Sequence, residues 1–136
     1  MKRSVLYIAA VFLAAALCIV VLTVSFMPRA RVSLFVKFNG DKLEQAIKSD
    51  GGIPVRIGYT SYNIWAGGDM TEFILFSFGS SYYGCYYSGS GAPYVFQNVD
   101  AELIKTGENR WEWSADGNRG ETSRIRGNWY YFEAKF

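Results

Sequence analysis

The chain has 136 residues, among them ten Tyr, ten Phe and four Trp, and it has no His. Its formal net charge is +2, yet the residues from Val32 onward carry ten Lys and Arg against twelve Asp and Glu. Nucleic-acid binding needs a concentrated basic surface, so we expect no nucleic-acid partner. The missing histidine excludes Ser-His-Asp and Cys-His catalysis within this chain, and it removes the commonest zinc ligand.

An uncharged apolar run occupies residues 5–26, directly after a basic tail at residues 1–4. As a helix, its 22 residues would span about 33 Å, enough for a hydrocarbon core of about 30 Å. The apolar region of a signal peptide is shorter, about 7–15 residues. The sequence therefore predicts a retained single-pass signal anchor in a membrane, a juxtamembrane linker at residues 27–31 and one domain at residues 32–136.

Two processing alternatives stay open. Residues 23–25, Thr-Val-Ser, have small side chains at the spacing that signal peptidase recognises, which would allow cleavage after Ser25. Cys18 invites comparison with lipidated cysteines, but Leu17 stands where such a site needs a small residue. We therefore interpret Cys18 as an ordinary apolar residue of the span.

The orientation of the span follows from the basic residues near its ends. Lys2 and Arg3 flank one end, and Arg29 and Arg31 flank the other, so the counts nearly balance. A short N-terminal tail with a basic pair usually stays in the cytoplasm. We therefore expect the domain at residues 32–136 to be extracytoplasmic, at the cell membrane.

The start of this domain reads as a strand followed by a helix. Residues 32–38, VSLFVKF, alternate in a way that predicts a strand with one buried face. A turn at residues 39–41 would lead into the one helix that we expect in the domain, ended by Gly51-Gly52 and Pro54. The apolar stripe of that helix comprises Leu43, Ala46 and Ile47.

The rest of the chain has strand patterns separated by turn residues. The segment 71–78 is apolar on both faces, so we expect it to be central or covered by the helix. In the last strand Tyr130 and Phe132 should face one way, with Trp129 and Tyr131 facing the other. We predict a mainly β fold with one α-helix, arranged as a small antiparallel sheet or a β-sandwich. The strands are predicted at residues 55–59, 61–65, 71–78, 82–87, 94–97, 101–105, 110–114, 123–126 and 128–136.

Cys85 lies between two tyrosine pairs in the stretch SSYYGCYYSGSG, residues 80–91. A nucleophilic thiol needs a base or a cation to hold the thiolate, and the chain offers no histidine. We therefore interpret Cys85 as a buried cysteine of a strand, and Gly84 as a point of close approach by a ring or a backbone.

The acidic residues offer the remaining route to catalysis. A glycosidase needs two carboxylates about 5–9 Å apart, one of them with a raised pKa. We interpret the acids as solvated surface or turn residues and name no catalytic residue, metal ligand or cofactor. The Asp116–Glu121 segment is too short for a calcium loop. The acids considered are Asp69, Glu72, Asp100, Glu102, Glu108, Glu112, Asp116 and Glu121.

Clusters of aromatic residues are the most distinctive feature of this sequence. Alternate residues of a strand face opposite ways, so some rings must point outward unless both faces are covered. Outward Trp and Tyr can stack on sugars or seat a protein partner, whereas the competing interpretation is that they fill the core. The candidate ligand-binding residues are Tyr83, Tyr87, Trp111, Trp113, Trp129 and Tyr131.

These observations favour a membrane-anchored, non-enzymatic binding domain whose ligand the sequence does not identify; cell-wall glycan and a membrane-protein partner are the candidates. One alternative is a small carboxylate-dependent hydrolase acting on cell-surface glycan. Another is an accessory subunit whose span does the work, since the alanines at residues 9–10 and 14–16 would allow close helix packing.

Overall fold

The structure is a computed structural model that describes residues 2–49 and 52–136. The chain divides into two compact units, which meet between Arg31 and Val32. The first unit contains helix α1 (Lys2–Phe26), and the second contains all the strands. Met1 of the predicted tail and Gly51 of the predicted helix stop lie outside the described residues.

Helix α1 is apolar on all sides between Leu6 and Thr23. Its segment Leu6–Thr23 has a mean hydropathy of 2.7, and none of it is buried by the rest of the chain. By length and composition this helix can cross a membrane. A signal sequence near an N-terminus can meet the same test, so α1 is compatible with a membrane anchor and with a signal.

Helix α2 (Pro28–Lys48) replaces the predicted strand at residues 32–38. The strand prediction is wrong because the residues that are buried, Val32, Val36 and Leu43, recur at helical spacing. Over seven residues a period of two and a period of 3.6 both place positions 32 and 36 on one side, so the short pattern is ambiguous. The helix predicted after residue 41 is the C-terminal part of α2.

The predicted turn at residues 39–41 is also wrong, because Gly40 lies inside α2. A Cβ atom at Gly40 would lie 2.8 Å from a guanidinium nitrogen of Arg126 and 3.3 Å from Nε1 of Trp129. The glycine therefore allows the sheet to approach the helix closely.

Seven strands form one open antiparallel sheet in the order β3-β4-β5-β9-β8-β7-β6. A separate two-stranded ribbon consists of β1 (Arg56–Ile57) and β2 (Thr60–Ser61). The prediction of a mainly β chain with an antiparallel sheet is confirmed. The seven strands are β3 (Asn63–Gly67), β4 (Met70–Phe78), β5 (Ser81–Ser88), β6 (Ile104–Gly107), β7 (Arg110–Ala115), β8 (Asn118–Arg126) and β9 (Trp129–Lys135).

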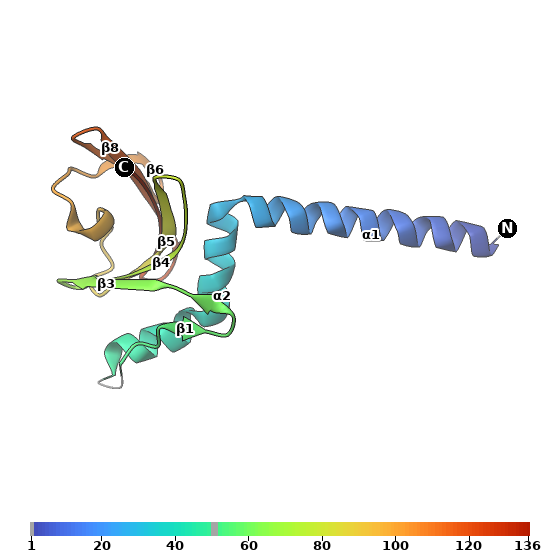
Figure 1. Cartoon of the computed structure of the whole chain (residues 1–136), viewed down its shortest axis with the longest axis horizontal. Coiled ribbons are helices and arrows are strands. Elements are labelled where there is room, and N and C mark those ends of the chain that lie inside the picture. The colour runs from blue at the N-terminus through green and yellow to red at the C-terminus, as the bar shows by residue number, and fades with distance from the viewer. Residues whose placement is uncertain (1, 50–51) are drawn as a thin grey trace. The chain divides into compact units, whose positions relative to one another are not determined.

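Different segments cover the two faces of this sheet. Helix α2 packs on one face, and the connection at residues 89–103 lies on the concave side (Figure 1). The buried residues under α2 include Phe73, Tyr87, Trp129 and Tyr131. Those under the connection are Met70, Tyr86, Val95, Phe96, Trp113, Tyr130, Phe132 and Ala134.

The connection departs from the strand predicted at residues 94–97. It contains the short 3₁₀ helix η1 (Phe96–Asn98), in which Gln97 and Asn98 have φ angles of 47° and 52°. Residues in this left-handed region cannot continue an extended strand, so the prediction is wrong. The following strand, predicted at residues 101–105, is observed as β6 at Ile104–Gly107.

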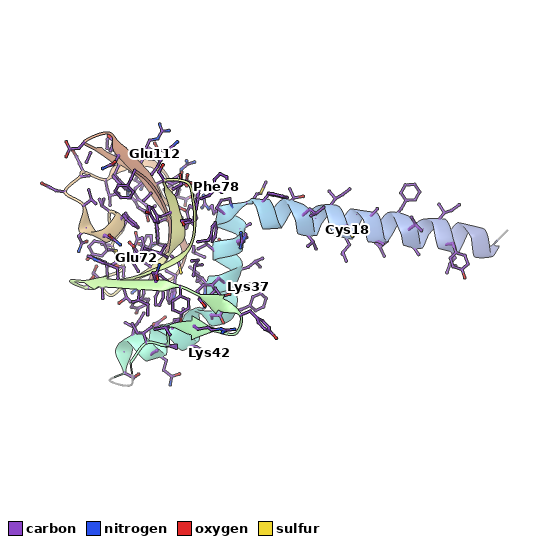
Figure 2. All side chains as sticks on the ribbon, viewed as in Figure 1. Cys18, Lys37, Lys42, Glu72, Phe78 and Glu112 are labelled. Atoms are coloured by element: carbon purple, nitrogen blue, oxygen red, sulfur yellow. The ribbon has the colours of Figure 1, made fainter. Side chains whose placement is uncertain are left out.

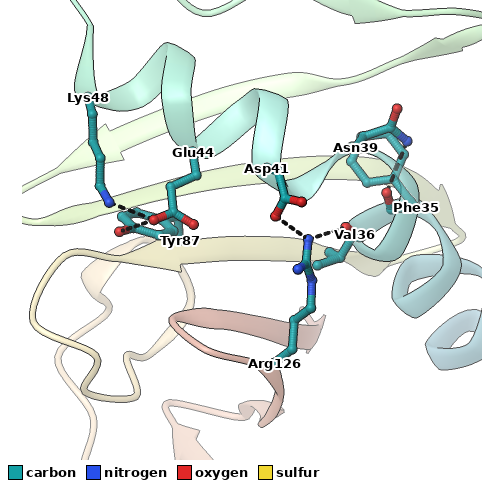
Figure 3. Close-up of polar contacts among 8 residues, drawn as sticks. All are labelled: Phe35, Val36, Asn39, Asp41, Glu44, Lys48, Tyr87 and Arg126. Atoms are coloured by element: carbon teal, nitrogen blue, oxygen red, sulfur yellow. Dashed lines mark hydrogen bonds and ion pairs between the residues drawn. The ribbon is translucent and has the colours of Figure 1, made fainter.

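Polar contacts fasten α2 to the sheet (Figure 3). Asp41 accepts a hydrogen bond of 2.7 Å from the guanidinium of Arg126. Glu44 binds the Lys48 ammonium at 2.6 Å and the Tyr87 hydroxyl at 3.2 Å. The contact with Lys48 lowers the pKa of Glu44. Both acidic side chains of this helix are therefore paired.

Candidate functional site

A groove lies on the part of the α2-facing side of the sheet that the helix does not fill. Its volume is about 610 Å³, within the range of about 300–1,000 Å³ that is typical of ligand sites. Strands β5 to β9 supply its walls, and most of its side chains are polar or charged. The lining residues are Ser81, Tyr83, Ile104, Thr106, Glu112, Trp113, Ser114, Arg119, Gly120, Glu121, Glu133 and Lys135.

Three glutamates form an acidic row across the groove. Glu112 is directly opposite Glu121, and Glu121 is directly opposite Glu133. Tyr83 of β5 extends this row beyond Glu133, and Ile104 of β6 extends it beyond Glu112. Side chains opposite one another in antiparallel strands have Cβ atoms about 4.5–5.5 Å apart, so the three carboxylates are close neighbours.

Two side chains form ion pairs or hydrogen bonds with the carboxylates of the acidic row. The guanidinium of Arg110 lies 2.5 Å from a carboxylate oxygen of Glu121 and 3.4 Å from one of Glu112. The Tyr131 hydroxyl donates a hydrogen bond of 3.2 Å to Glu133. Burial, with the charges of Glu133 and Glu121, raises the pKa of Tyr131, which therefore stays a neutral donor.

A basic row runs beside the acidic row. Arg119 and Lys135 are directly opposite each other on β8 and β9, and both are exposed. No acidic side chain in the described part of the chain forms an ion pair with either residue. Each is two residues from a glutamate on its own strand, so the two rows are about 7 Å apart. The groove therefore presents anionic acceptors next to cationic donors.

This segregation of charge disfavours folding. Like charges directly opposite each other in a sheet are destabilising, and the groove contains three such pairs: Glu112 with Glu121, Glu121 with Glu133, and Arg119 with Lys135. Local conflicts of this kind are expected at functional sites, where binding is favoured over stability. The groove is therefore the candidate site.

The structure divides the six predicted ligand-binding residues between this groove and the core. Tyr83 lines the groove, and Trp113 reaches it only from a buried position. The half-buried Trp111 packs with the residues under the connection. Tyr87, Trp129 and Tyr131 are buried beneath α2. Ligand binding by this set stays a prediction, and burial restricts direct contact chiefly to Tyr83.

The interpretation of Cys85 as a buried strand residue is confirmed. Its side chain is fully buried, and this burial raises the pKa of the thiol, which is the opposite of what a nucleophile needs. The predicted close approach at Gly84 is also confirmed. A Cβ atom there would lie 2.0 Å from the carbonyl oxygen of Phe73 and 2.8 Å from the ring of Phe132.

The candidate acids fall into different environments. Asp69 accepts hydrogen bonds from the Tyr94 hydroxyl at 2.9 Å and from the Ser90 amide at 2.7 Å, which lower its pKa. The surface interpretation is wrong for Glu72, which lies fully buried under the connection. Only Glu112 and Glu121 come together in the groove. The remaining candidate acids are exposed outside the groove: Asp100, Glu102, Glu108 and Asp116.

Sequence reasoning missed three charged residues that line the groove, Arg119, Glu133 and Lys135, and it missed Arg110, which pairs with two of the lining glutamates. Their signal is weak in a single strand, because alternating charges are normal on a solvated face. Only the register between β7, β8 and β9 places like charges opposite one another. Among the described residues, no group of three His, Cys, Asp or Glu side chains is arranged to hold a metal ion.

Comparison of the chain with protein-family models, with curated proteins and with solved structures found no match. The function must therefore be inferred from the chemistry of the groove and from the apolar helix α1.

Proposed function

We propose that this chain is a single-pass membrane protein whose extracytoplasmic domain binds a polyhydroxylated ligand, such as a cell-surface glycan, without transforming it. The observation that supports this ligand class is the pair of oppositely charged rows in the groove. A hydroxyl group both donates and accepts hydrogen bonds, so neighbouring sugar hydroxyls can bind Glu133 and Arg119 together. Tyr83 offers an aromatic surface next to them.

The groove is less suited to an apolar protein interface. Binding hot spots in such interfaces are buried aromatic residues and arginines inside an apolar surround. Among the large apolar side chains that are exposed in the described residues, only Ile104 lines the groove. A small polar ligand therefore fits the lining better than a membrane-protein partner.

Catalysis by the acidic row has one argument in its favour. Glu112 and Glu121 are directly opposite, so their Cβ atoms are about 4.5–5.5 Å apart, and their carboxyl groups can reach the separation of about 5–5.5 Å that a retaining glycosidase uses. However, Arg110 is ion-paired with both. A general acid must deliver a proton, whereas two carboxylates that share one guanidinium act as acceptors. This arrangement favours binding over hydrolysis.

Anchoring by α1 with the domain outside is the second part of the proposal. It is supported by the length and hydropathy of α1 and by the basic pair Lys2-Arg3 in the N-terminal tail. Protease added to intact spheroplasts should digest a C-terminal tag on an uncleaved chain. A protected tag would place the domain in the cytoplasm and would remove cell-wall glycan as the ligand.

The ligand is tested with the full chain in detergent micelles and immobilised cell-wall polysaccharide fractions. We expect one fraction to retain the protein. Arg119→Ala and Glu133→Gln should each weaken retention about tenfold, because each variant loses one hydrogen bond to a charged group. Arg56→Ala, at an exposed arginine of β1, is the matched control and should bind normally. Soluble sugars released during incubation would reveal hydrolysis instead.

Failure of every polysaccharide fraction to retain the wild-type protein would reject the glycan ligand. Equal losses in Arg119→Ala and Arg56→Ala would reject the groove as the site. Trp129→Ala is a poor test, because Trp129 is only 2% exposed and its removal would unfold the core under α2.

A further inference from the structure

The outward side of α2 carries apolar residues that the sheet leaves uncovered. Leu34 is 42% exposed and Phe38 is 72% exposed, whereas Val32, Val36 and Leu43 on the inward side are fully buried. Leu34 and Phe38 are one helical turn apart, so they form one ridge. A soluble helix normally keeps such a ridge polar, and its exposure here points to an apolar partner.

Two lysines flank this ridge. At about 100° per residue, Lys37 lies about 60° to one side of Leu34, and Lys42 follows Phe38 by one helical turn. Both lysines are exposed and project from α2 (Figure 2). No ion pair forms with either in the described part of the chain. The nearby acids Asp41 and Glu44 are already paired with Arg126 and Lys48.

The position of the ridge in the chain identifies its partner. Helix α1 ends at Phe26, and α2 begins at Pro28. At about 1.5 Å per residue, Phe38 is only about 15 Å along the helix from Pro28. If α1 crosses a bilayer, this part of α2 starts at the headgroup layer, where helices with an apolar ridge and flanking lysines lie in the interface.

We propose that the α2 ridge, formed by Leu34 and Phe38 and flanked by Lys37 and Lys42, docks onto the anionic surface of the membrane that α1 spans. The apolar side chains enter the boundary between headgroups and acyl chains, and the lysines bind lipid phosphates. This inference rests on the proposed anchoring. It adds a second contact with the membrane, made by the domain that carries the groove.

The test uses the full chain in vesicles that contain phosphatidylglycerol and a lipid with a shallow nitroxide quencher. An environment-sensitive aromatic fluorophore, NBD, is attached at Phe38→Cys in a Cys18→Ala background, so that one aromatic group replaces another. The control label is placed at Ile104→Cys, an exposed apolar site on β6. We expect quenching at position 38 and little at position 104.

Charge dependence is measured with the same label. Neutral phosphatidylcholine vesicles should lower the quenching at position 38. In anionic vesicles Lys37→Gln and Lys42→Gln should each reduce the docked-to-free ratio about fivefold, whereas Lys105→Gln should not. Quenching that is the same in neutral vesicles would overturn the role of the lysines.

Two failures can be told apart. Carbonate extraction of the protein from the vesicles would overturn the anchoring, and the docking with it. Carbonate resistance with an unquenched label at position 38, or with equal quenching at positions 38 and 104, would overturn the docking alone.

Discussion

Glu72 is a carboxyl group buried in the core without a full set of partners. Its side chain is 0% exposed, Oε2 accepts a hydrogen bond of 3.2 Å from the Gln97 amide, and Oε1 has no hydrogen-bond partner among the described residues. Trp65 and Tyr86 are its neighbours on the adjacent strands. Burial raises the pKa of Glu72 to about 8, so the group is mostly protonated at neutral pH.

This burial makes the stability of the domain depend on pH. The folded state holds the Glu72 proton up to about pH 8, whereas the unfolded chain releases it near pH 4.5. The folded state therefore binds more protons in this window, and the free energy of unfolding falls as the pH rises through it. Each unit of pKa difference corresponds to about 1.4 kcal/mol, so the total fall is a few kcal/mol at most.

Glu72→Gln should flatten this pH dependence, because the amide stays neutral throughout the window. The measurement is thermal unfolding of the full chain in micelles between pH 5 and about pH 8, followed by tryptophan fluorescence. Glu102→Gln, at an exposed acid, should keep the wild-type slope. Parallel slopes for wild type and Glu72→Gln would contradict the raised pKa.

At the scale of the element, Leu34 of α2 separates the observed helix from the strand that alternation predicts, because that strand would bury it, and Leu43 is the buried reference. Leu43 is fully buried, so Leu43→Ala should lower the free energy of unfolding by about 2–5 kcal/mol. Leu34 is exposed, so Leu34→Ala should change it by less than about 0.5 kcal/mol. Denaturant unfolding of both variants makes the comparison. A large loss for Leu34→Ala would contradict the orientation of this helix.

The same contrast shows what a single sequence can predict of the fold. Strands β4, β5, β7 and β9 were predictable because turn residues bound them and their patterns are at least five residues long. The N-terminal half of α2 was not, because seven residues fit two periods. Nor was the connection at residues 89–103, whose left-handed residues Gln97 and Asn98 are not glycines.

The candidate site was less predictable than the strands. Tyr83, Glu112 and Glu121 were recognisable as residue types, but the groove depends on which strands are neighbours. Strand β9 forms a hairpin with β8, but on its other side it pairs with β5, a long-range arrangement that local patterns do not encode. The sequence therefore identified the aromatic residues, most of which lie in the core. The charged rows arise from the register between paired strands.

At the scale of the whole molecule, the domain should bind its ligand independently of the sequence of α1. Both core clusters and every groove residue lie at positions 32–136. We therefore expect replacement of residues 5–26 by an unrelated apolar span of equal length to leave polysaccharide retention within about twofold of wild type, since uncoupled parts contribute additively. Retention and carbonate resistance are measured on the same preparation.

The exchange also discriminates against an accessory subunit that works through its span. In that case the alanines at residues 9–10 and 14–16 would contact a partner helix, and an unrelated span would remove the small residues on which close packing depends. A folded, membrane-inserted exchange variant that binds polysaccharide normally but fails to support the cellular function would assign that function to the span. A variant that retains both would assign it to the domain, because the only property shared by the two spans is the ability to hold the groove at the membrane.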